Sequence, residues 1–479
     1  MIGARVRTGD RRRSTVTAVG VVDGRIAALG TAGDVRRRLG AGAEVLTFPG
    51  ATVVPGLVDP HVHLFGMATR GARVDCAALG RARELLQVVA RVASRLPAGA
   101  WVRGDGLDDT LLDRLPLAAE LEEAAPRNPV RLRHRSRHAS LLSCSAMRMM
   151  GASLPRRARR GAGLIVGREQ AIGHAVGPLP RAELAAGLAD VSTRLVARGV
   201  TALGDATPRG GRGWAPVIEE MAAGRFLPRV SGMRPVGVRP FPGRERLTAG
   251  PIKIMVEEEG TGLRPRPATL ARLVARAAAS GERVAVHCLG ASTLVAAVEA
   301  FAQLPARGRR RARHRLEHVA ECPAPLVERI AALGLTVVTN PAFVALRGDV
   351  YRAETSAEAH GGIYRAGSLE RAGVPLAGAS DAPVSPCDPW LGMAAARQRL
   401  TASGARLGWS ERLSARSALA LFTTGAAAAL GDDRLGRIVP GGPADLVVVD
   451  RDPLRTAAEA LADTQVLLTM IDGEVAGAR

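Results

Sequence analysis

The chain has 479 residues, of which 47% are hydrophobic and 23% charged, a balance typical of a water-soluble globular protein with one large domain and a smaller satellite. It has no signal-peptide pattern and no run near the ~20 apolar residues of a membrane span, so no membrane partner is expected. The net charge of +21 comes with only 3% aromatic residues and no aromatic platform among the arginines, which argues against nucleic acid as a partner.

The two ends of the chain read as short strands and turns. Residues 16–54 contain Asp23-Gly24 between two apolar runs, a strong hairpin signal. The C-terminal end repeats this pattern with a second Asp-Gly turn, Asp472-Gly473. We therefore expect residues 1–57 and 432–479 to form one small β-sandwich domain built from both chain termini.

Residues 58–431 alternate strand-like apolar runs with helical stretches, the pattern of parallel βα units. Eight such runs predict an α/β fold with a (β/α)8 TIM-like barrel. The stretch at about 65–195 is too long for a loop, so it predicts a structured insertion after the first strand. The predicted strands cover residues 56–64, 199–207, 229–236, 251–257, 283–289, 315–320, 335–340 and 374–382.

Four of these strands end in residue types that bind metals. His61 and His63 close the first strand, where alternation puts both imidazoles on one face. His287, His318 and Asp381 end the fifth, sixth and eighth strands. Taken singly, each has a structural interpretation, such as a satisfied core histidine or an Asx turn before proline. Because catalytic groups of barrels cluster at these strand ends, their combination predicts one metal site.

Lys253, in the fourth strand, is the only lysine of the chain, so 65 of the 66 basic residues are arginine. A buried lysine can lose its proton, because desolvation disfavours the ammonium form. The neutral amine can then add carbon dioxide to form a carbamate, an anionic ligand able to bridge two cations, whereas arginine stays protonated. The alternative is an ion pair between Lys253 and an acidic residue at 257–259.

These motifs resemble the amidohydrolase superfamily over nearly the whole chain, and most closely its YtcJ-like branch (amidohydrolase family 3), which includes N-substituted formamide deformylases. The chain departs from the usual pattern after Lys253, where MVEEEG replaces an Ala-Asp-Gly turn. The segments that carry the resemblance, besides the strand-four lysine, are PGLVDPHVHL, VAVHCLG, RLEHVA, GASDAPV and GRIVPGGPADLVVVDRDP.

The resemblance implies a centre of one or two divalent ions bridged by carboxylated Lys253. Zinc is expected first, although manganese, iron and cobalt suit the same ligand types. The implied ligands are His61, His63 and Asp381 for one ion and His287 and His318 for a second.

The implied activity is hydrolysis of a C–N bond in an amide, an N-formyl or N-acyl compound or a cyclic amide by metal-activated water. Asp381 would take the proton of the water, and His138 in the insertion would polarise the carbonyl unless it is a surface histidine. Two alternatives stay open. One is a mononuclear deaminase of the same superfamily, which lacks the bridging lysine, and the other is a metal-free scaffold protein.

The expected partner is a small amide-type substrate, and a homodimer is an open hypothesis. Five cysteines are scattered without a Cys-X-X-Cys pair. This usage predicts free thiols and a cytoplasmic location.

Overall fold

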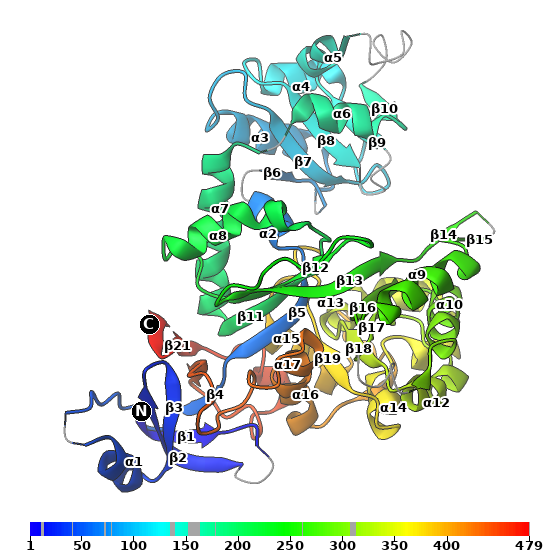
Figure 1. Cartoon of the computed structure of the whole chain (residues 1–479). Helices are drawn as coiled ribbons and strands as arrows, with labels where there is room; N and C mark the ends of the chain where they lie inside the picture. Colours follow the sequence, from blue (N-terminus) through cyan, green and yellow to red (C-terminus); the bar gives the residue numbers. More distant parts are fainter. Residues whose placement is uncertain are drawn as a thin grey trace. The chain divides into compact units, whose positions relative to one another are not determined.

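The protein is described by a computed structural model in which the chain divides into two compact units (Figure 1). The larger unit comprises residues 1–64 and 189–479, and the smaller one comprises residues 65–188. The structure describes residues 1–10, 14–40, 42–70, 73–77, 79–134, 139–151, 163–177, 179–260, 262–306 and 313–478.

Eight parallel strands form the centre of the larger unit and follow one another around the sheet in chain order. Near-continuous buried apolar runs suit strands that are covered on both faces. The last strand returns to the first, because Asp381 N donates to His61 O at 2.9 Å and His63 N donates to Ala382 O at 2.7 Å. All eight predicted strands and the predicted barrel fold are confirmed. The strands are β5 (Leu57–Val62), β11 (Val200–Asp205), β12 (Arg229–Arg234), β13 (Leu247–Met255), β16 (Val284–Cys288), β17 (Arg315–His318), β18 (Thr336–Thr339) and β19 (Leu376–Gly378).

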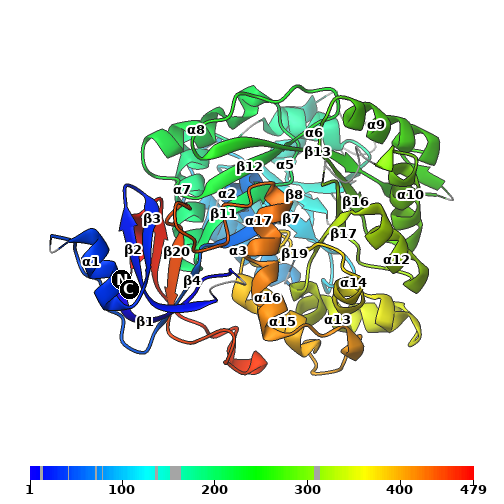
Figure 2. The ribbon, with the colours of Figure 1, turned by 60° about the horizontal axis from the view of Figure 1, so that its bottom comes forward.

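Helices surround these strands (Figure 2). The helix α9 (Pro267–Ala279) has a proline in its first turn, where the missing N–H removes no helical hydrogen bond. Its residues Leu270, Val274 and Ala277 recur at helical spacing and are buried in the core outside the strands. The other helices in the described part of this unit are α8 (Ala215–Ala222), α10 (Ala291–Ala302), α12 (Ala324–Leu333), α13 (Ala342–Glu354), α14 (Ala366–Arg371), α15 (Pro389–Gln398), α16 (Ala415–Leu421) and α17 (Thr424–Leu430), with the short 3-10 turns η3 (Gly211–Trp214), η4 (Ala359–Gly362), η5 (Trp409–Glu411) and η6 (Ala458–Ala460).

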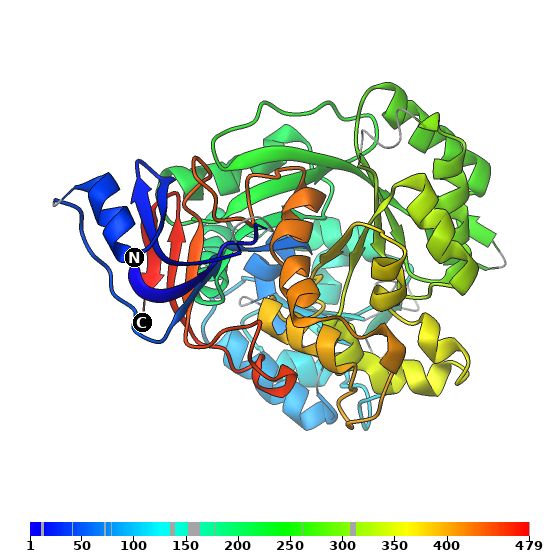
Figure 3. The ribbon, with the colours of Figure 1, turned by 90° about the horizontal axis from the view of Figure 1, so that it is seen from below.

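Strands from both ends of the chain join in one seven-stranded sheet, and the two termini lie close together beside it (Figure 3). In the hairpin turns Asp23 and Gly24 have φ of 47° and 73°, and Asp472 and Gly473 have φ of 51° and 81°. Two positive φ angles match the twist of the flanking strands, which explains the Asp-Gly pairs. Across the sheet the strands are β22 (Glu474–Ala478), β21 (Val466–Ile471), β20 (Leu446–Val449), β4 (Thr52–Pro55), β1 (Ile2–Arg7), β2 (Thr15–Val22) and β3 (Arg25–Gly30), and β3 leads into α1 (Ala32–Leu39).

The smaller unit has its own five-stranded sheet and its own core. Leu85 and Val89 of one helix and Leu121 of another pack with Val102 and Val130 of the sheet. The helices among its described residues are α2 (Leu64–Arg70), α3 (Ala82–Ala93), α4 (Ala118–Ala124), α5 (Cys144–Met150), α6 (Glu169–Val176) and α7 (Arg181–Ala197), the last continuing into the larger unit. Across the sheet the strands are β10 (Leu164–Val166), β9 (Ala139–Leu142), β8 (Val130–His134), β7 (Val102–Leu107) and β6 (Arg73–Asp75).

A small hairpin of β14 (Glu257–Glu259) and β15 (Gly262–Arg264) follows β13 and contains the acidic residues of the MVEEEG segment. None of the helices described here is long and apolar enough to cross a membrane.

Candidate metal centre

His61 and His63 lie at the end of β5, and both imidazoles approach Asp381. Their Nε2 atoms lie 3.5 Å and 3.3 Å from Asp381 Oδ1. The His61 side chain is only 1% exposed and donates from Nδ1 to Glu317, whereas the more open His63 places its Nδ1 2.8 Å from Thr207 Oγ1. An ionised carboxylate can only accept, so the proton of His61 is on Nδ1 and its Nε2 lone pair is free to bind a cation.

Asp381 follows β19 with a φ of 59°, a backbone conformation that is sparsely populated outside glycine. Its backbone N–H is held by His61 O, which points the carboxylate toward the histidines. Asp381 Oδ1 is buried and has no hydrogen-bond partner within the described part of the chain. Burial acts to raise the pKa of Asp381, but the neighbouring His63, His61 and His318 hold it below its ordinary value. A buried, ionised oxygen that faces imidazole nitrogens suits a cation.

His318 ends β17 and is also in the left-handed region, with a φ of 69°. Its Nδ1 donates to Asn340 Oδ1 at 2.8 Å, and Asn340 Nδ2 donates to Ala379 O at 3.1 Å, which orients the amide. His318 Nε2 is therefore left as the acceptor. The ring centroid of His318 lies 4.7 Å from that of His61 and 4.6 Å from that of His287.

Burial keeps these imidazoles neutral. It lowers the pKa of His61 to about 3 and that of His287 to about 2, and neighbouring His318 and Lys253 act in the same direction. A neutral imidazole is the form that binds metals. Side-chain atoms of His61, His318 and Asp381 lie within 4.8 Å of one another and could hold one ion. This trio combines His61 and Asp381, which were expected to bind the first ion, with His318, which was expected to bind the second. His287 lies next to His318.

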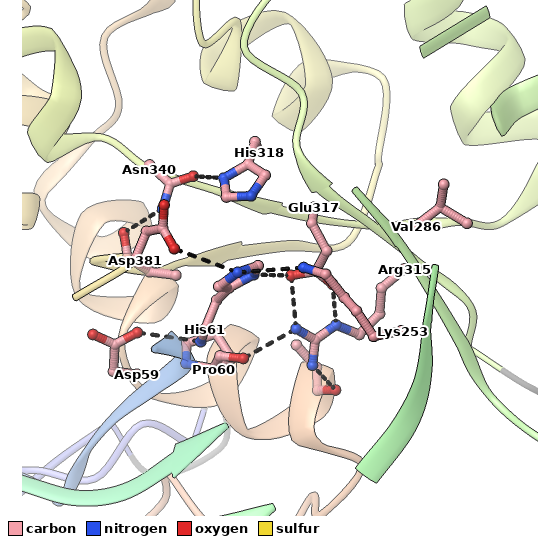
Figure 4. A network of polar contacts seen from close by, with 12 residues as sticks. Asp59, Pro60, His61, Lys253, Val286, Arg315, Glu317, His318, Asn340 and Asp381 are labelled. Carbon is pink, nitrogen blue, oxygen red and sulfur yellow. Dashed lines mark hydrogen bonds and ion pairs between the residues drawn. The ribbon is translucent and has the colours of Figure 1, made fainter. Parts of the chain in front are cut away.

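Lys253 points into the same cluster from β13 (Figure 4). Its side chain is buried, and Nζ lies 3.5 Å from His61 Nε2. Burial lowers the pKa of Lys253, although the negative charges of Glu317 and Asp381 oppose this shift. The alternative ion pair of Lys253 with residues 257–259 is not found in the described structure, because those three residues are exposed in the β14–β15 hairpin, whereas Lys253 faces the histidines.

Sequence analysis missed a buried ion pair beneath the histidines (Figure 4). Arg315 donates to Glu317 from Nε at 2.7 Å and from Nη2 at 2.9 Å. Burial acts to raise the pKa of Glu317, but Arg315 and His61 hold it well below its usual value. The spacing of Arg315 and Glu317 could have indicated this ion pair, because two charged residues two positions apart share one face of an apolar strand.

Asp59 is a second buried carboxylate that sequence analysis did not single out. It accepts from Ser380 N at 3.2 Å and from His61 N at 3.3 Å, so it ties β5 to the loop that carries Asp381. Burial raises the pKa of Asp59 to about 6. His138, the expected carbonyl-polarising residue, lies outside the described residues.

The sequence pattern of the amidohydrolase family matches residues 49–476. The chain belongs to the amidohydrolase family. This amidohydrolase is 29% identical to the N-substituted formamide deformylase of Arthrobacter pascens over 99% of its own length and 97% of the relative. It is 26% identical to YtcJ of Bacillus subtilis (strain 168), a proposed amidohydrolase, over 98% and 96% of the two chains.

Solved structures agree on the fold of this amidohydrolase. An uncharacterized metal-dependent hydrolase from Pyrococcus horikoshii OT3 matches with a TM-score of 0.81 and 20% identity over 96% of this chain and 98% of the other. A second such hydrolase, from Pyrococcus furiosus, matches with a TM-score of 0.78 and 22% identity over 95% and 99%. The predicted family is confirmed, and membership supports a hydrolase that acts on small molecules.

Proposed function

We propose that this amidohydrolase hydrolyses the C–N bond of a small N-formyl, N-acyl or cyclic amide with the help of bound divalent metal, zinc first among the candidates. The observation that carries the proposal is the approach of His61, His318 and Asp381 to within 4.8 Å, with Asp381 Oδ1 unpartnered among the described residues. The similarity to an N-substituted formamide deformylase supports the choice of bond.

The residues present suit a metal centre. His61 and His63 with Asp381 would hold one ion, and His287 with His318 would hold a second. A bound divalent ion supplies Lewis acidity, lowering the pKa of a water molecule and polarising a carbonyl. Glu317 and Asn340 orient His61 and His318 so that each turns an Nε2 lone pair toward the cluster.

Asp381 is the proposed general base. Its lowered pKa leaves it ionised at neutral pH, and its Oδ1 can accept a proton from the attacking water. Delivery of that proton to the leaving nitrogen would complete the hydrolysis, because an amide nitrogen leaves far more easily as a neutral amine.

Lys253 is proposed to carry the carbamate that bridges two ions. Burial favours its neutral amine, which is the form that adds carbon dioxide. Its Nζ lies beside His61 Nε2, where an added carboxylate would place two oxygens among the histidines. The carbamate would also replace a buried positive charge by a negative one, which suits nearby cations.

A mononuclear deaminase is the second candidate, because one group of His61, His318 and Asp381 is enough for a single ion. The two candidates differ in their metal content and products. We expect zinc-loaded protein to bind about two ions per chain and to cleave members of an N-formyl, N-acyl and cyclic amide panel. One ion per chain with ammonia release from aminated heterocycles would favour the deaminase, and no activity on either panel would reject both.

Variants make this assay specific to the proposed site. Asp381→Asn should be inactive on every amide that the wild-type protein cleaves. Asp463→Asn, an exposed aspartate in the terminal β domain, is the matched control and should behave as the wild type.

A further inference from the structure

Met255 is an exposed apolar residue two positions after Lys253 in β13. Ile252 and Ile254 of β13, and Val256 directly after the strand, pack outward in the core beneath the helices. Because side chains alternate along a strand, Met255 shares the inward face of Lys253. It is the last residue of β13 and lies one step nearer to the open end than the buried lysine.

The strand register places Met255 beside a candidate metal ligand. Met255 of β13 is the register partner of His287 of β16, and partners in neighbouring strands project to the same side. The residue two positions after His287 is Leu289, which is also large and apolar. Met255 is 41% exposed and Leu289 is 43% exposed, although both belong to residue types that are normally buried.

The loop that carries Leu289 is held in place by acidic side chains of its neighbours. Glu321 N donates to Leu289 O at 2.9 Å, and the Glu321 carboxylate accepts from Ala291 N at 3.2 Å. Ser292 donates to Glu258 of the β14–β15 hairpin. The hairpin that follows Met255 is thus joined to the first turn of α10, directly after the loop that carries Leu289. Such a joined edge is preorganised, so less entropy is lost when a ligand packs against it.

The barrel interior below this edge is apolar as well. Met233 of β12 packs with Ala206 and Ala285 in a buried cluster, and Ala285 lies on the same face of β16 as His287. The inner face of β12 and β16 therefore carries apolar groups near Lys253, beside the polar network of Glu317 on β17 and Asp381 after β19.

We infer that Met255 and Leu289 form an apolar subsite that selects substrates with an alkyl or aryl group attached to the amide. This inference rests on the proposed function, because it deepens the same site by naming the substrate class. An apolar group that leaves water against these side chains gains affinity with each methylene it buries. A charged or strongly polar substituent gains nothing there.

The test is a homologous series of N-alkylformamides from N-methyl to N-hexyl, with an N-acyl series of the same lengths as a second arm. The zinc-loaded wild-type protein should show kcat/KM rising about twofold to fourfold per methylene group in at least one arm. That arm identifies which side of the amide faces the subsite. The ratio of kcat/KM between the longest and the shortest substrate is the readout, since it is independent of the fraction of protein that is folded.

The nearly isosteric variants Met255→Gln and Leu289→Asn should lower this ratio about tenfold or more when combined. Val295→Thr is the matched control, because Val295 is also 43% exposed but lies within α10, and it should leave the ratio unchanged. A flat wild-type series, a preference for cationic substituents, or an unchanged ratio in the double variant would overturn the inference.

Calorimetric binding of the same two series to the zinc-loaded Asp381→Asn protein separates this inference from the proposed function. Affinity that rises with chain length and flattens after Met255→Gln supports the subsite even if no amide is cleaved. Affinity independent of chain length in both series rejects the subsite even if amides are hydrolysed.

Discussion

Replacing Glu317 by glutamine probes the buried network that orients His61. The Glu317 side chain is 0% exposed and accepts from both Arg315 and His61. Glutamine keeps the size of the side chain but removes the negative charge that both partners face. Arg315 would then keep the carbonyl oxygens of Ala429, at 3.1 Å, and Pro60, at 3.0 Å, as acceptors for a buried positive charge.

Two effects of different size are expected. Breaking a buried ion pair typically costs about 3–5 kcal/mol, and because glutamine keeps one oxygen acceptor we expect the lower end, about 3 kcal/mol. His61 also loses the carboxylate that fixes its Nδ1–H tautomer. Loss of such a partner typically lowers metal affinity about 10–100-fold, which corresponds to about 1.4–2.7 kcal/mol.

Urea unfolding of the metal-free protein measures the first effect, and zinc titration of the folded protein measures the second. Glu299→Gln is the control, because Glu299 is half exposed and its ion pair with Arg329 at 2.7 Å should contribute less than about 1 kcal/mol. If Glu317→Gln binds zinc as tightly as the wild type and unfolds at the same urea concentration, the orienting role assigned to Glu317 is wrong.

Further predictions concern the base, the bridge and pH. Asp381→Asn should retain metal but lose at least about 10²–10⁴-fold in turnover, and normal turnover would place the base elsewhere. Lys253→Arg should lose metal and activity, whereas acetate or propionate should partly restore the activity of Lys253→Ala. Two tightly bound ions in Lys253→Arg would refute the bridging role of Lys253. In the metal-free protein, burial lowers the pKa of His61 to about 3 and that of His287 to about 2, so the unfolded chain takes up these protons first as the pH falls below ~6.5. The stability of the metal-free protein should therefore fall between about pH 7 and pH 3, by up to about 1.4 kcal/mol per pH unit for each histidine. Asp59, with a pKa raised to about 6, offsets part of this loss because its folded form takes up a proton first. A stability that does not change with pH would contradict the burial of neutral imidazoles.

Features encoded by local pattern could be predicted from the sequence. The eight barrel strands are apolar runs, and the Asp-Gly turns at Asp23 and Asp472 have a local backbone requirement. His61 and His63 share one face because alternation is a property of a single strand. These predictions needed no knowledge of which segments meet in space.

Features that depend on distant partners could not be predicted in the same way. Glu317 was visible as an acidic residue in an apolar strand, but its contact with His61 spans 256 positions in the chain. The same holds for Asn340, which orients His318, and for Asp59, which reaches Ser380. No local pattern distinguishes a carboxylate that orients a histidine from one that only pairs with an arginine.

Closure of the barrel between β5 and β19 also brings the residues of the candidate site together. The backbone hydrogen bonds between these two edges are formed by His61, His63, Asp381 and Ala382, so residues of the candidate site also close the barrel. About 320 residues separate the two edges in the chain, so these contacts are strongly non-local. During synthesis the chain therefore cannot assemble this site until the eighth strand has emerged.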